Sequence, residues 1–173
     1  LVAFYLSQDM AGKAERALQK MLEKNPDSAE VHAMLGNFYQ SRRQPDKAEK
    51  AYLAAIEKSD QPADLRAILA DFYYETGKPE PAKQQADAVL AENPEHPMAS
   101  LVHAKMLLRD RKNSEALAIL DRLIKDFPRW AEAYYTKAVA HLNKQETELS
   151  YNAVDRALQI SPRNAEAKIG RAS

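Results

Sequence analysis

Cysteine is absent from this 173-residue sequence. Without thiols the chain forms no disulfide bond, no thiolate zinc site and no cysteine nucleophile. The N-terminus shows neither the basic segment nor the cleavage site of a signal peptide. The localisation is therefore unknown, with cytoplasm and periplasm equally open.

Glycine is scarce, and neither sign of charge is in excess. With 4 glycines and no G-x-x-x-x-G-K-[ST] or G-x-S-x-G motif, the chain has little material for a phosphate loop or a nucleophile elbow. We therefore predict that it is not an enzyme and uses no cofactor. Lys plus Arg number 25, as do Asp plus Glu, and this balance disfavours nucleic acid as a partner. No apolar run approaches the roughly 18–20 residues of a membrane helix, so we expect no membrane contact from this segment.

Proline marks out a repeat. Pro26, Pro94, Pro128 and Pro162 fall on one ruler of 34 residues, and Asp60 stands at the single mark without proline. Three further columns keep this spacing: Ala14, Ala48, Ala82, Ala116 and Ser150; Gly36, Ala70, Ala104, Ala138 and Ala172; and Leu22, Ile56, Leu90, Ile124 and Leu158. We predict that the small columns let two helices approach closely, as at Gly36 and Ala48, and that the aliphatic column fills the space between successive units.

Residues 29–62 show what one repeat contains. Apolar residues spaced by three and four predict a first helix from about Ala29 to Arg42, with Asp27 and Glu30 as its capping box. Pro45 suits the first turn of a second helix. The predicted buried residues are Val31, Met34, Leu35, Phe38 and Tyr39 in the first helix and Ala48, Tyr52, Ala55 and Ile56 in the second. Two helices of about 13 residues joined by a short turn form an antiparallel hairpin.

This unit resembles the tetratricopeptide repeat, through Leu35-Gly36, Tyr39, Ala48, Tyr52 and Ala55. The resemblance implies an all-α fold, a right-handed superhelical solenoid of antiparallel helix hairpins with a 34-residue repeat, and we expect a fragment of a longer bacterial array. The implied divisions form one continuous array, with a partial repeat at 1–28, complete repeats at 29–62, 63–96, 97–130 and 131–164, and the start of a further repeat at 165–173.

Some residues depart from the family pattern or offer other chemistry. Lys137, His141 and Ser150 make the helix packing of 131–164 the least regular. His103 and His141 occupy marks that are apolar in other repeats, so we expect both to pack inside with a ring nitrogen hydrogen-bonded. The histidines lack metal-ligand spacing, and we predict no metal site.

In the resembling family, the first helix of each hairpin lines a concave groove that binds a partner. The matching positions form three columns: Ala33, Ala67, Leu101 and Tyr135; Asn37, Asp71, Lys105 and Val139; and Leu6, Gln40, Tyr74, Leu108 and Leu142. We expect these side chains to be open to solvent, with Lys105 and Tyr135 as the strongest contacts.

The resemblance implies a protein or peptide as the partner. A family variant that grips an acidic C-terminal tail needs long polar groups where Ala33 and Ala67 stand, so we expect instead a helix or an extended apolar peptide. The alternative function is a structural spacer whose uncapped ends associate end to end.

Overall fold

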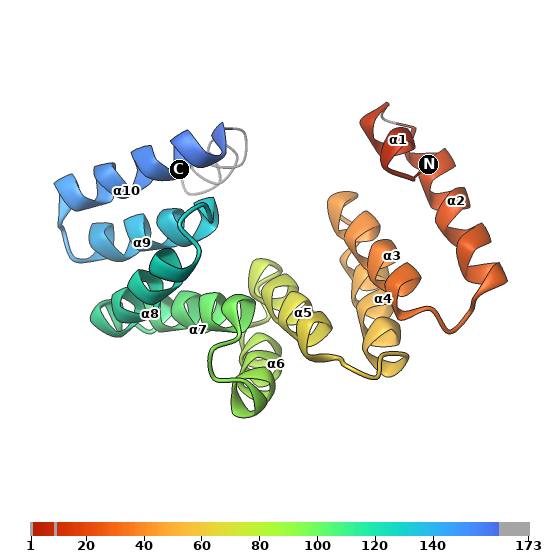
Figure 1. The fold of residues 1–173 in the computed structure, drawn as a ribbon, viewed down its shortest axis with the longest axis horizontal. Coiled ribbons are helices and arrows are strands. Elements are labelled where there is room, and N and C mark those ends of the chain that lie inside the picture. The colour runs from red at the N-terminus through yellow and green to blue at the C-terminus, as the bar shows by residue number, and fades with distance from the viewer. Residues whose placement is uncertain (1, 9, 163–173) are drawn as a thin grey trace. The chain divides into compact units, whose positions relative to one another are not determined.

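The computed structural model describes residues 2–8 and 10–162, which form helices joined by short turns (Figure 1). The helices are α1 (Val2–Ser7), α2 (Ala11–Lys24), α3 (Ala29–Ser41), α4 (Pro45–Glu57), α5 (Ala63–Glu75), α6 (Pro79–Glu92), α7 (Pro97–Arg109), α8 (Asn113–Asp126), α9 (Ala131–Asn143) and α10 (Thr147–Ile160). No strand occurs in this part of the chain. The predicted all-α repeat fold is confirmed. The side chain of Leu6 and the predicted further repeat at 165–173 lie outside the described residues.

The helices group into two compact units that divide between Lys78 and Pro79. In the first unit, α1 packs on α2, α2 on α3, α3 on α4, and α4 on α5. In the second unit, α6 to α10 pack in the same order, and α7 also contacts α9. The predicted hairpin at 63–96 contributes α5 to the first unit and α6 to the second.

The start of α3 differs from the predicted capping box. Ser28 is the N-cap, and its hydroxyl accepts a hydrogen bond of 3.3 Å from the backbone N–H of Val31. Asp27 instead forms an ion pair of 2.8 Å with Lys58. A hydroxyl one residue nearer the helix thus satisfies the free N–H, and the carboxylate of Asp27 reaches across to the end of α4.

The turns between first and second helices share a left-handed residue at the repeat spacing. Arg43, Gly77, Arg111 and Gln145 have φ values of 55°, 75°, 62° and 62°. In each turn the following residue donates to a carbonyl five residues back, as Lys78 N does to Tyr73 O at 2.8 Å. These bonds close the helix C-terminus, and they hold non-glycine residues in the same geometry as Gly77.

The two small columns lie in the interior, as predicted, at every described position. In the last hairpin they meet directly, because Ser150 Oγ donates to the carbonyl of Ala138 at 3.0 Å. In the 29–62 hairpin a Cβ atom on Gly36 would meet the ring of Tyr52, with two ring atoms at 2.5 Å. Tyr52 therefore occupies the space that a side chain at position 36 would need, and the close approach of Gly36 to Ala48 stays a prediction.

The aliphatic column is half-buried throughout. The cores use other positions: Ala14, Leu18, Leu35 and Phe38 in the first unit, and a larger cluster that includes Leu101, Leu120 and Leu123 in the second. Leu22 and Ile124 pack against the outside of these two clusters. The aliphatic side chains therefore extend the cores at their edges.

Each departure from the family pattern in 131–164 has a polar partner. Besides the Ser150 bond, Lys137 pairs with Asp121 at 2.6 Å, and buried His141 places Nδ1 at 2.7 Å from Glu146. Lys144 and His141, in that order, hold the pKa of Glu146 below its usual range. The prediction for His141 is thus confirmed, whereas His103 is only half-buried.

Candidate partner-binding surface

In the first unit, α3 and α5 carry the predicted contact residues at different depths. Asn37 and Gln40 are exposed, Ala33, Asp71 and Tyr74 are half-buried, and Ala67 is fully buried. Ala67 is therefore an interior residue, since no part of its side chain reaches solvent. The exposed part of this face is polar and comes from α3.

The hydroxyl of Tyr52, on α4, contacts two polar side chains of α3. Its ring is fully buried in α4, and its hydroxyl lies 2.8 Å from Asn37 Oδ1 and 2.6 Å from Gln40 Oε1. Burial, and secondarily the charge of Asp71, raise the pKa of Tyr52 above its ordinary value. The phenol therefore stays protonated at neutral pH and fixes the two exposed amides. The helix spacing predicts that Tyr52 is buried, but it does not predict these hydroxyl contacts, because Asn37 and Gln40 precede Tyr52 by 15 and 12 residues.

In the second unit, α7 contributes little exposed surface. Leu101, Lys105 and Leu108 are all buried. Lys105 Nζ forms an ion pair of 2.8 Å with Glu132 Oε1, and the two side chains are 7% and 22% exposed. The expectation that Lys105 is open to solvent is therefore wrong: its charge is used between α7 and α9.

Helix α9 carries three apolar side chains along one face, of which Leu142 is the most exposed. Tyr135 and Val139 are half-buried, and Leu142 is 60% exposed. These residues stand at i, i+4 and i+7, so they share one helix face. Large apolar side chains on a solvent-facing helix surface are typical of interaction sites. We name Tyr135, Val139 and Leu142 the α9 stripe.

Comparisons with known proteins identify the family. Tetratricopeptide-repeat models match residues 5–63, 44–106 and 101–165. The chain therefore belongs to the tetratricopeptide-repeat family, which is generally non-catalytic. This fold indicates a protein–protein interaction scaffold with protein or peptide partners. A search of curated protein sequences finds no match.

Solved structures share the fold at low sequence identity. YrrB, described as a TPR protein with an unusual peptide-binding site, is 20% identical with a TM-score of 0.60, over 99% of this chain and 89% of its own. PilF of Pseudomonas aeruginosa is 21% identical with a TM-score of 0.72, over 99% and 83%. PilW, a type IV pilus biogenesis factor, is 16% identical with a TM-score of 0.77, over 92% and 74%.

Among the described residues, no helix combines the length and apolar character needed to cross a membrane.

Proposed function

We propose that the chain is a non-catalytic scaffold in which the first helix of each hairpin binds a peptide or helix of a partner protein. The observation that carries the proposal is the α9 stripe, which keeps Leu142 largely exposed on the same helix face as Tyr135 and Val139. Burying one such leucine against a partner contributes about 1.5–3 kcal/mol. Truncating an aromatic anchor at the centre of an interface costs about 2 kcal/mol or more.

The first unit adds a second, polar contact region. Tyr52 holds Asn37 and Gln40 at fixed positions on α3, so these amides are ordered before a partner arrives. Pre-ordered side chains lose less conformational entropy on binding. Two amides can donate to and accept from the main chain of an extended peptide, because each carries both a carbonyl and an NH2 group. The peptide-binding site of YrrB supports the same kind of ligand for this fold.

A peptide-display selection on the 173-residue chain tests this proposal. The affinity of each enriched peptide is then measured for Tyr135→Ala with Leu142→Asp. The matched control is Tyr151→Ala with Leu149→Asp, because these two residues of α10 are 72% and 50% exposed but belong to a second helix. We expect at least a tenfold loss for the α9 variant and less than a twofold loss for the control. The reverse order would place the partner outside the first helices.

The second candidate function is a spacer that self-associates. The exposed apolar side chains of Leu149 and Tyr151 favour it, since both lie on α10, outside the proposed binding surface. Sedimentation equilibrium separates the two functions. A monomer that binds selected peptides supports the scaffold, whereas concentration-dependent association that the α10 variant abolishes supports the spacer.

A further inference from the structure

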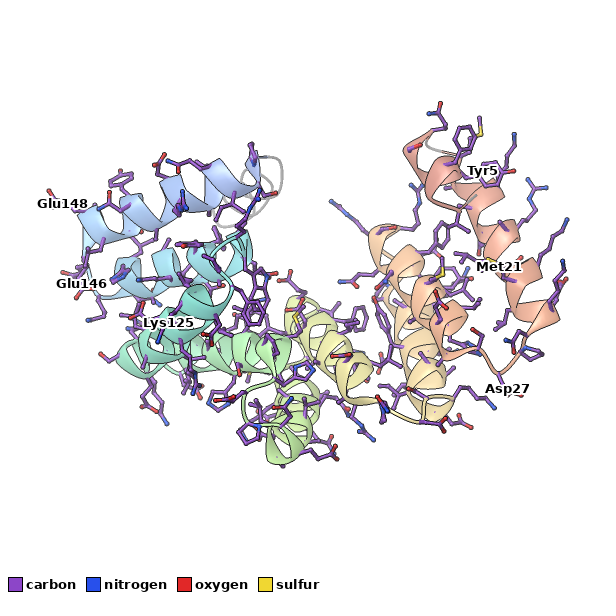
Figure 2. The ribbon with its side chains drawn as sticks, in the orientation of Figure 1. Tyr5, Met21, Asp27, Lys125, Glu146 and Glu148 are labelled. Atoms are coloured by element: carbon purple, nitrogen blue, oxygen red, sulfur yellow. The ribbon has the colours of Figure 1, made fainter. Side chains whose placement is uncertain are left out.

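A groove of about 830 Å³ opens between α1, α2 and α3 in the first unit. Its apolar lining comes from three helices and includes Val2, Tyr5, Met21 and Met34. Figure 2 labels Tyr5 on α1 and Met21 on α2. Neither the α9 stripe nor the amides of Asn37 and Gln40 are among the described residues that line this groove.

Met21 marks a position that is covered in the other hairpins. Its side chain is 40% exposed. The residues one, two, three and four repeat lengths further on are Ala55, Val89, Leu123 and Ala157, and none is more than 4% exposed. Met21 is thus more exposed than the equivalent residue of each later hairpin.

The groove is also strongly basic along α2. Lys13, Arg16, Lys20 and Lys24 all line it, all are exposed, and their spacing of three, four and four places them on one face of the helix. Arg16 Nε donates to the carbonyl of Gly12 at 3.1 Å. No ion pair involves these four cations among the described residues. Glu23 is the only carboxylate in the described lining. This part of a chain with no formal net charge therefore attracts anions.

We propose that this groove binds an amphipathic helix of a partner protein that carries carboxylates beside a seam of apolar side chains. The apolar seam would cover Met21 and Met34, whose flexible thioether side chains adapt to different shapes. The carboxylates would pair with Lys20 and Lys24, one turn apart on α2. Apolar burial provides affinity in this arrangement, while the charges select the acidic helix over a basic one.

The probe is a fluorescein-labelled synthetic peptide of about 16 residues, long enough to be partly helical. It has leucines at a three-and-four spacing and glutamates at the flanking positions, and a second peptide has lysine at every glutamate position. Fluorescence anisotropy measures both against the 173-residue chain. We expect the glutamate peptide to bind at least tenfold more tightly, and its affinity to fall between about 50 and 500 mM salt. Equal affinity for both peptides, or no binding of either, overturns the proposal.

Two double variants of equal charge change locate the site. Lys20→Glu with Lys24→Glu reverses two charges in the groove. Lys50→Glu with Lys125→Glu reverses the charges of two exposed lysines that do not line the groove. We expect at least a tenfold loss for the groove variant and less than a twofold loss for the control. Equal losses would show that binding follows overall charge. Circular dichroism confirms that both variants fold, and Met21→Asp tests the apolar lining without changing a lysine.

Two outcomes distinguish this proposal from neighbouring ones. If Tyr135→Ala with Leu142→Asp reduces binding of the glutamate peptide as much as the groove variant does, the peptide occupies the α9 stripe and the groove proposal fails. If the chain self-associates and Lys20→Glu with Lys24→Glu abolishes that association, a second copy occupies the groove and the partner-helix proposal fails. If no peptide can be selected that binds the α9 stripe, the proposed function fails, but the binding of the glutamate peptide to the groove is unaffected.

Discussion

Gly36 lies directly beneath the ring of Tyr52, so that a Cβ atom on Gly36 would be 2.5 Å from both Tyr52 Cδ1 and Cε1. The equivalent pairs in the later repeats combine alanine with a residue smaller than tyrosine, as in Ala104 with Leu120 and Ala138 with Val154. The one large aromatic ring in this column thus accompanies the one glycine. A side chain at position 36 would displace a fully buried ring whose hydroxyl is also hydrogen-bonded.

The first prediction concerns this pair. Gly36→Ala should lower the free energy of unfolding by about 1–3 kcal/mol, because the methyl group overpacks the space under the ring. Adding Tyr52→Leu should recover part of the loss, since Ala104 with Leu120 shows the same combination. Urea unfolding of the two single variants and the double variant measures the coupling. Additive effects would contradict the contact.

Gly12→Ala is the matched control, since no atom lies within 4 Å of a Cβ at Gly12. Gly12 is in α2, where alanine is the better helix former. This variant should gain up to about 1 kcal/mol.

The second prediction concerns the left-handed turns. Replacing Arg43, Arg111 or Gln145 by glycine should each raise stability by up to about 1 kcal/mol, because glycine adopts positive φ without a Cβ penalty. Gly77→Ala should lower stability by about 1–2 kcal/mol, although space for the methyl group is open. Thermal unfolding checks all four variants. A stabilising Gly77→Ala would show that the turn relaxes to another conformation.

The third prediction is a loss of stability in acid that depends on Lys78. A hydrogen bond from Lys78 Nζ, at 2.6 Å, is the main reason that the pKa of Glu49 lies below its ordinary value of 4.5. A carboxyl with a lowered folded pKa stabilises the fold above its unfolded pKa, and this contribution disappears as the pH falls through the folded value. Wild type should therefore exceed Lys78→Met in stability at pH 7, and the difference should shrink below about pH 4.5. A constant difference would contradict the linkage.

The fourth prediction addresses the alkaline side of the same contact. Tyr73 donates to Glu49 Oε1 at 2.9 Å, and burial, followed by this bond, raises the pKa of Tyr73 to about 12. A raised folded pKa gives stability that is complete below the unfolded value and is lost as the pH rises through the folded one. Tyr73→Phe should cost about 0.5–1.5 kcal/mol at pH 7. The difference in the free energy of unfolding between wild type and Tyr73→Phe should narrow between pH 10 and about pH 12. Urea unfolding measures this difference.

The fifth prediction concerns the buried ion pair. Lys105→Glu places two carboxylates together between α7 and α9 and should cost about 3–5 kcal/mol. The double reversal Lys105→Glu with Glu132→Lys should recover much of this loss, because it restores opposite charges. Lys83→Ala is the control, since its pair with Asp87 is exposed and worth about 0.3–0.5 kcal/mol. Urea unfolding gives the free energy of unfolding of all three variants. A small loss of stability for Lys105→Glu would mean that the ammonium group of Lys105 reaches water.

Much of the fold could be predicted because its rules are local. Helix spacing and short turns define the hairpins, and the small columns mark positions that must be buried. The binding surface depends instead on contacts between distant residues. Lys105 is of a residue type expected in a binding groove. Its side chain is buried instead, because it donates to Glu132, which lies 27 positions later in the sequence. Tyr52 likewise acts on α3 from another helix.

Other details could not be predicted because neighbouring residues offer similar chemistry. Asp27 and Ser28 can both cap α3, and the choice depends on Lys58, which attracts the carboxylate of Asp27. Arginine and glutamine also give no sequence signal for positive φ, because backbone hydrogen bonds impose that conformation on them. Among these four turn residues, only Gly77 is of a type that indicates positive φ from the sequence.

The left-handed turns have a consequence for how such a chain can vary over time. Residue identity at the turn is free, since arginine, glycine and glutamine all occupy it, but its length is not. One inserted residue would rotate the following helix by about 100°, which would carry the small residue of that helix away from its partner. Duplications and exchanges of whole hairpins preserve this angle, whereas single insertions in the turn do not. We therefore expect related chains to differ freely in turn sequence and hardly at all in turn length.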